Sequence, residues 1–86
     1  MLIKVLANEF LLSASSNTTV NNAVVVRVVH TGTQEHVITI GNGAGSNIGS
    51  FTILNNSELI LEKDRTDTLQ VDSGTDVKVV SVAYKN

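Results

Sequence analysis

The chain has 86 residues, which allows a single domain, and no cysteine, which excludes disulfide scaffolds and thiolate metal sites. Six basic and eight acidic residues give a net charge of −2, so the chain lacks the basic surface that nucleic-acid binding requires. Charged residues make up only 16% of the chain, whereas about 25% is usual in soluble domains.

The side-chain pattern predicts an all-β protein. Thirteen valines, six isoleucines and nine threonines are β-branched, which disfavours helices and suits a pleated sheet. Eight extended segments are expected, at residues 3–6, 10–14, 23–29, 36–40, 49–54, 58–63, 68–71 and 76–84. Short strands separated by turn residues are typical of sandwiches and barrels. We therefore predict one β domain, 1–86, folded as a small antiparallel β-sandwich or barrel of about seven or eight strands.

The segments in the middle of the chain differ in pattern. Residues 23–29 are apolar on both faces except at Arg27, which predicts a strand that is central in a sandwich or covered by a neighbouring subunit. Residues 36–40 follow a short turn that contains glycine, which predicts a hairpin with 23–29. Residues 58–63 alternate between apolar and polar, and we expect Glu58 and Lys63 to flank the apolar alternation as charged gatekeepers.

The aliphatic content indicates self-association. Val, Ile and Leu make up close to a third of the chain. A chain of this length buries only about 60–65% of its surface on folding, so some of these side chains are expected to remain outside the core. Without disulfides or cysteine-based metal sites, subunit association is the most economical way to cover them. Residues 1–8 are apolar and set apart by Asn8 and Glu9, so we expect an N-terminal arm or edge strand there.

The glycine-rich segment 41–50 does not resemble a phosphate-binding loop. Such loops stand between a strand and a helix and usually contain a lysine. Here a strand follows and the segment has no lysine. We expect the segment to form a flexible hairpin tip, with a loop that becomes ordered against a neighbouring protein as the alternative.

His30 and His36 are the strongest candidates for a metal site. They flank the predicted turn, with Glu35 adjacent, so a hairpin would bring the two rings together. The sequence places no third or fourth ligand beside them. We therefore predict no metal, and histidines that are exposed to solvent or to a partner.

The acidic residues occur in two pairs, Asp64 with Asp67 and Asp72 with Asp76. Such pairs can bind calcium, but neither has the dense carboxylate spacing of a calcium loop. Aspartate is also a common turn former, which is the role expected for all four.

Catalytic residues and cofactor sites are not predicted. No nucleophile motif is present and nothing places a histidine base beside a serine, so we expect no enzyme activity. Phe10 and Phe51 are expected in the core, which leaves Tyr84 as a candidate stacking platform. A carbohydrate-binding module that uses Tyr84 and residues 41–50 therefore remains an alternative function.

No targeting or membrane segment is evident. The apolar run at the start is too short for a signal peptide, and the run at 23–29 is far shorter than the roughly 20 residues of a membrane helix. We expect synthesis in a cytoplasm and no membrane partner.

Several segments together resemble a known group of proteins. They are residues 23–29 (AVVVRVV), 48–53 (IGSFTI), 57–63 (SELILEK), 66–69 (TDTL) and 79–84 (VVSVAY). This pattern resembles the short virion structural proteins of tailed bacteriophages of marine bacteria and cyanobacteria, over about 65 residues from position 20 onward. One departure is Arg65, where the group's pattern has a proline before the Thr-Asp-Thr turn.

The resemblance implies a non-enzymatic virion protein, made in the host cytoplasm and placed on the particle. A capsid decoration (cement) protein on the head surface is the function we favour. Its implied partners are the major capsid protein and further copies of itself, with a homotrimer favoured. A tail, baseplate or fibre-associated subunit is the alternative within the same class.

Overall fold

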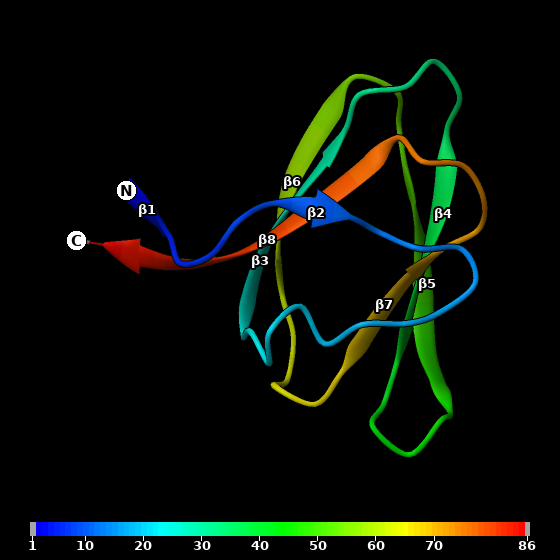
Figure 1. The fold of residues 1–86 in the computed structure, drawn as a ribbon. Coiled ribbons are helices and arrows are strands. Elements are labelled where there is room, and N and C mark those ends of the chain that lie inside the picture. The colour runs from blue at the N-terminus through cyan, green and yellow to red at the C-terminus, as the bar shows by residue number, and fades with distance from the viewer. Residues whose placement is uncertain (1, 86) are drawn as a thin grey trace.

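The computed structural model describes residues 2–85, with only the main chain described for Leu2, Tyr84 and Lys85. The described residues form strands and turns without any helix, and hence no helix that could cross a membrane. The strands are β1 (Leu2–Val5), β2 (Phe10–Leu11), β3 (Val25–His30), β4 (His36–Gly41), β5 (Asn47–Ile53), β6 (Ser57–Glu62), β7 (Thr68–Val71) and β8 (Val77–Lys85). They form two antiparallel sheets that face each other (Figure 1). The predicted all-β fold is confirmed, and its form is a small sandwich.

The first sheet is organised around β8. Its strand order is β1-β8-β3-β6, and β2 also pairs with β8. β8 has nine residues, and six of them, from Val77 to Val82, pair with β3. On the opposite side, β8 pairs first with β2 and then, from Val82 to Lys85, with β1. The last part of β8 therefore extends beyond the strands of the sandwich.

The second sheet has the order β5-β4-β7. β4 and β5 form the hairpin predicted around the glycine-rich segment, with residues 42–46 at its tip. The side chain of Asn42 accepts hydrogen bonds from the main-chain N–H groups of Ala44 and Ser46, which hold the tip closed. Gly45 has φ +91°, a conformation that glycine adopts at little cost.

Aliphatic side chains from both sheets form one core. β3 alternates along its length, so that Val26 and Val28 are fully buried, and the predicted alternation of β6 is also observed. The other buried members are Leu12, Val20, Ala23, Ile38, Ile53, Leu69, Val71, Val77 and Val79. Phe10 and Phe51 are partly buried against this cluster, as expected.

The predicted hairpin between 23–29 and 36–40 was wrong. β3 belongs to the first sheet and β4 to the second, so the intervening residues cross from one sheet to the other. β6 and β8 pair with all six residues of β3 on its two sides, which leaves no edge for β4. The expectation of a central strand at 23–29 is confirmed, although local sequence did not show which strands would flank it.

Lys63, at the end of the β6 alternation, is a buried charge. Its side chain is only 6% exposed, and Nζ donates hydrogen bonds to the carbonyl oxygens of Ala23, at 2.6 Å, and Asp64, at 3.1 Å. Burial lowers the pKa of this ammonium group, although the carboxylates of Asp67 and Asp64 partly oppose that effect. Lys63 thus joins the end of β6 to the segment that leads into β3.

Candidate functional site

The end of the molecule that carries β1 projects from the sandwich. Figure 1 shows β1 and the last part of β8 leaving the two-sheet body together, with both chain ends at this projection. We call this two-stranded element, Leu2–Val5 with residues 82–85, the arm. The pairing of β3 with β8 ends at Val82, so residues 83–85 have β1 on one side and no described strand on the other. The arm therefore has two open main-chain edges among the described residues.

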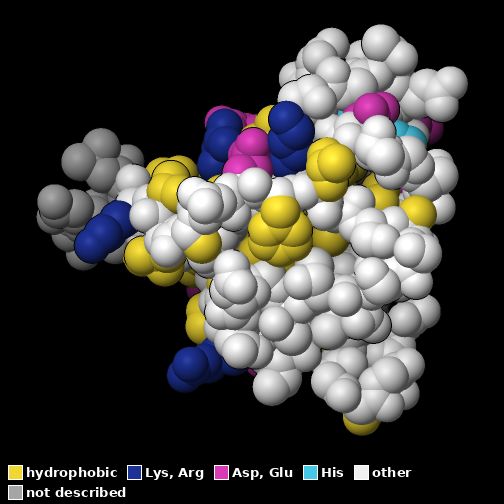
Figure 2. Space-filling model, viewed as in Figure 1, with side chains coloured by type: hydrophobic (Ala, Val, Ile, Leu, Met, Phe, Trp, Pro, Cys, Tyr) yellow, Lys and Arg dark blue, Asp and Glu magenta, His cyan; other side chains and the backbone are white. Residues whose placement is uncertain are grey.

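Apolar side chains are exposed on and beside the arm. Ile3 and Val5, on β1, are 39% and 59% exposed, and Leu6, directly after β1, is 54% exposed. Val24, which precedes β3, is 46% exposed. Figure 2 shows apolar side chains along this projecting part of the molecule. Isolated exposed apolar residues are ordinary, but several at one end of a small chain indicate a contact surface.

A hollow of about 540 Å³ lies where the arm joins the sandwich. Its apolar lining comes from the segment after β1, the segment before β3 and β8, namely Leu6, Ala7, Ala23, Val24 and Val82. Asn21, Asn22, Arg65 and Ser81 supply the polar part of the lining. A hollow with this mixed apolar and polar lining resembles the composition of surfaces through which proteins contact one another.

An unusual turn forms one wall of this hollow. Val20, Asn21 and Asn22 all have positive φ, between 53° and 59°, so the chain makes a short left-handed turn there. This conformation costs a β-branched residue such as Val20 about 1–2 kcal/mol. Val20 is fully buried, and hydrogen bonds from its own N–H and from that of Asn22 to the hydroxyls of Thr18 and Thr19 hold the turn. Burial of Val20 thus places the next residues against the arm.

The two histidines do come together, but inside the protein. Their ring centroids are 4.9 Å apart, although β3 and β4 are in different sheets. The expectation of exposed histidines was wrong, because His30 is 1% and His36 is 5% exposed. His30 Nδ1 accepts a hydrogen bond from the N–H of Gly32, and Nε2 donates to the carbonyl oxygen of Gln34. Its ring thereby fixes the chain segment that crosses between the sheets.

Two of the paired carboxylates approach His36 from the turn between β7 and β8. The Nδ1–H of His36 donates to Oδ1 of Asp72 at 2.9 Å, and Nε2 lies 3.9 Å from Oδ2 of Asp76. His36 Nε2 is buried without a hydrogen-bond partner. Partial burial raises the pKa of Asp72, but hydrogen bonds from His36, Val37 and Ser73 outweigh this, and the pKa is lowered.

This histidine cluster (His30, His36, Asp72 and Asp76) holds the fold together at one end. Both ring nitrogens of His30 are already engaged by main-chain groups. Among residues 2–85, no group of three or more His, Cys, Asp or Glu side chains is arranged to hold a metal ion. The geometry therefore assigns the cluster to packing between the two sheets.

The other acidic pair forms a turn, as predicted. The N–H of Asp64 donates to Oδ2 of Asp67 at 3.1 Å, and the N–H of Asp67 donates to the carbonyl oxygen of Asp64. One carboxylate thus closes the corner between β6 and β7.

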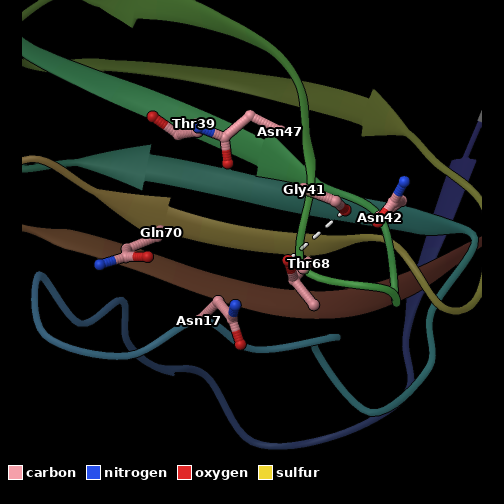
Figure 3. Close-up of a pocket in the computed structure, with 8 residues that line it drawn as sticks. Asn17, Thr39, Gly41, Asn42, Asn47, Thr68 and Gln70 are labelled. Carbon is pink, nitrogen blue, oxygen red and sulfur yellow. Dashed lines mark hydrogen bonds between the residues drawn. The ribbon is translucent and has the colours of Figure 1, made fainter.

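The residues of the alternative sugar site are not brought together. Tyr84 lies in the arm, where its side chain is outside the described part, and residues 42–46 form a hairpin tip at a distant end of the molecule (Figure 1). A small polar pocket does lie beside this tip, between β4, β5 and β7, and Figure 3 shows the amide and hydroxyl groups that line it. Its volume is about 30 Å³, room for one water molecule rather than a sugar ring.

The histidine cluster and the hollow beside the arm each combine residues from distant parts of the chain. Asp72 reaches His36 from 36 positions away, and Val24 and Leu6, from separate segments, line the same hollow. The sequence feature that predicted the arm was the apolar segment at the start of the chain. No local pattern marked the burial of the histidines.

Comparison with known proteins adds no relative. The sequence matches no family model, and no curated protein or solved structure matches it.

Proposed function

We propose that this chain is a non-enzymatic structural protein of a phage particle, which binds further copies of itself and the subunits of the capsid. The observation that carries the proposal is the arm, a two-stranded element with open edges and with exposed Ile3 and Val5, followed directly by exposed Leu6. A two-stranded ribbon by itself is at best marginally stable in water. Contact with another protein would cover its apolar side chains and pair its edges.

The rest of the structure suits a subunit that acts by contact. The small polar pocket beside the hairpin tip has room for one water molecule, and the buried histidines and Lys63 are engaged in holding the fold. The resemblance to short virion proteins of tailed phages supplies the biological setting. Within that setting we favour decoration of the head, in which a small subunit clamps neighbouring capsid subunits, over a place in the tail, baseplate or fibre.

Light scattering during size-exclusion chromatography tests self-association. We expect a stable oligomer, a trimer if the chain decorates three-fold positions of a shell, and we expect deletion of residues 1–8 to convert it to monomer. A full-length chain that stays monomeric at high concentration would contradict this part of the proposal.

A density map of an intact particle containing the chain tests its location. Copies on the head surface, at sites repeated over the shell, would support decoration. A low copy number at the tail would favour the alternative, and absence of the chain from the particle would overturn the proposed function.

A further inference from the structure

The surface that complements β1 is β8, which belongs to the same chain. β1 forms its described strand pairing with β8 alone, through the pairs from Leu2↔Lys85 to Val5↔Val82. One more hydrogen bond, from the N–H of Leu6 to the carbonyl oxygen of Ser81, continues this pairing. Any identical chain presents the same β8, so β1 of one copy fits β8 of another equally well.

The connection of β1 to the body is short and lies at the surface. Only Ala7, Asn8 and Glu9 separate Leu6 from β2, and Asn8 and Glu9 are exposed. Glu9 forms an ion pair with Arg27 of β3, at 3.3 Å, which fixes the root of the arm to the sandwich. A rotation about Ala7 and Asn8 would therefore release β1 as a unit while β2 and the core stay in place.

We infer that β1 is exchanged between copies of this chain, so that β1 of one copy pairs with the projecting end of β8 in the next. This inference rests on the proposed function, because it specifies how the copies associate. Exchange keeps each hydrogen bond of the β1–β8 pairing and adds contact between two bodies, so it is a low-cost route to an oligomer. In a closed oligomer each copy gives one strand and receives one.

The same geometry explains why the arm extends away from the body. Residues 83–85 of β8 have no described strand partner except β1. In a single chain, this ribbon leaves Val5 and Leu6 more than half exposed. Between two copies, the same ribbon would be a bridge with a folded body at each end, and its apolar side chains would lie at their interface.

Cysteine cross-linking tests the exchange directly, because the native chain contains no cysteine. Val5 and Val82 are paired in antiparallel register, at Cα separations of about 4.5–5.5 Å that suit a disulfide. One chain carries Val5→Cys, and a second chain, with a tag of different mass, carries Val82→Cys. The two are unfolded together, refolded and oxidised. Exchange predicts a covalent heterodimer on a non-reducing gel.

A pair inside the sandwich provides the matched control. Val29 and Lys78 are paired between β3 and β8 in the body of the first sheet. Chains with Val29→Cys and Lys78→Cys, mixed in the same way, should give no heterodimer. Placed together in one chain, the Val5→Cys and Val82→Cys substitutions should give a covalent oligomer whose size reports the number of copies in the closed ring.

Cross-linking and light scattering together distinguish a failure of β1 exchange from a failure of the proposed self-association. If the double variant forms only an intrachain disulfide while light scattering shows an oligomer, exchange is wrong and self-association stands. If the cross-link is intrachain and the protein is monomeric at every concentration, both exchange and self-association are wrong. A heterodimer from the Val5 and Val82 chains, without one from the control pair, supports the exchange.

Discussion

Nδ1 of His36 lies 2.9 Å from Oδ1 of Asp72, and this contact joins the first residue of β4 to the turn between β7 and β8. The histidine is buried whereas the side chain of Asp72 is 46% exposed. A buried ring that donates to a carboxylate at the surface keeps one polar group satisfied without burying a charge. The hydrogen bond closes the end of the sandwich where the chain crosses between its sheets.

This hydrogen bond makes stability depend on acidity. The pKa of Asp72 is lower in the folded protein than its ordinary value of 3.8. Its carboxylate therefore stabilises the fold above that pH, and the contribution is lost as the pH falls through the lowered pKa. We expect Asp72→Asn to reduce the free energy of unfolding by about 1 kcal/mol or less near pH 6, and by less still near pH 2. Urea unfolding of both proteins across this range measures the difference.

The double variant with His36→Asn supplies the control. If His36 is the partner that matters, Asp72→Asn should cost less in the His36→Asn background, giving a coupling energy between the two positions. Independent effects of the two substitutions would show that Asp72 acts through the main chain of its turn instead.

A substitution at Gly74, which lies in the same turn as Asp72, tests how firmly the His36 ring is held. Its φ is +83°, and a methyl group there would stand 3.2 Å from Cε1 and Nε2 of His36. Gly45, with φ +91°, has no atom within 4 Å of the corresponding position. Alanine at either position has a backbone cost of about 1 kcal/mol. We expect Gly74→Ala to lower the free energy of unfolding by clearly more than Gly45→Ala, because the His36 ring is held by Asp72 and His30. Equal losses in urea unfolding would show that the ring moves aside freely.

The regular strands could be predicted because their signals are local. Alternation along β6 and the turn at Asn55 and Asn56 depend on residues close in sequence, and Asn56 has a positive φ of 53°, which asparagine tolerates. Local sequence does not determine which strands pair with each other. The segment between β3 and β4 has turn residues suited to a hairpin, yet β3 is already paired on both sides by strands from the second half of the chain. Which sheet a strand joins is set by that competition.

In the candidate sites too, some features can be predicted from local sequence and others depend on distant residues. An apolar N-terminal segment set apart by polar residues is visible in the sequence, and β1 does lie at an edge of the first sheet. The burial of His36 depends on a hydrogen-bond acceptor that the fold brings from another turn, Asp72, whereas His30 is bonded by Gly32 and Gln34 of its own segment. The burial of Lys63 likewise depends on a carbonyl group 40 positions away, at Ala23. Such residues look like surface residues until the fold supplies their partners.

Lys63 leads to a prediction at alkaline pH. Because burial lowers its pKa below 10.5, there is a pH range in which the unfolded chain carries a proton that the folded protein has released. In that range stability rises with pH. Lys63→Met keeps the length of the side chain but cannot titrate. We expect the free energy of unfolding of the natural protein to rise relative to that of Lys63→Met as the pH increases from 7 toward 10.5. A constant difference over this range, measured by urea unfolding, would contradict the buried position of the ammonium group.

The last prediction concerns the apolar side chains of the arm. Val5→Asp places a charge on a strand whose side chains are expected to lie between copies. Full burial of a valine contributes about 1.5–3 kcal/mol; Val5 is 59% exposed, so its loss removes part of that amount, and desolvation of the new carboxylate adds a further cost of at least about 1 kcal/mol. A loss of 1.4 kcal/mol corresponds to about a tenfold weaker equilibrium, and we therefore expect association to weaken more than tenfold. Sedimentation equilibrium over a range of concentrations measures the change.

Leu54→Asp is the matched control for this experiment. Leu54 follows β5 and is 59% exposed, the same fraction as Val5, but it does not belong to the arm. If general surface hydrophobicity drove association, the two substitutions would weaken it alike. If the arm is the contact surface, Leu54→Asp should leave the association constant nearly unchanged while Val5→Asp reduces it, and both variants should unfold at similar urea concentrations as monomers. Strong dissociation by Leu54→Asp alone would place the interface at the turn between β5 and β6, and the arm would lose its assigned role.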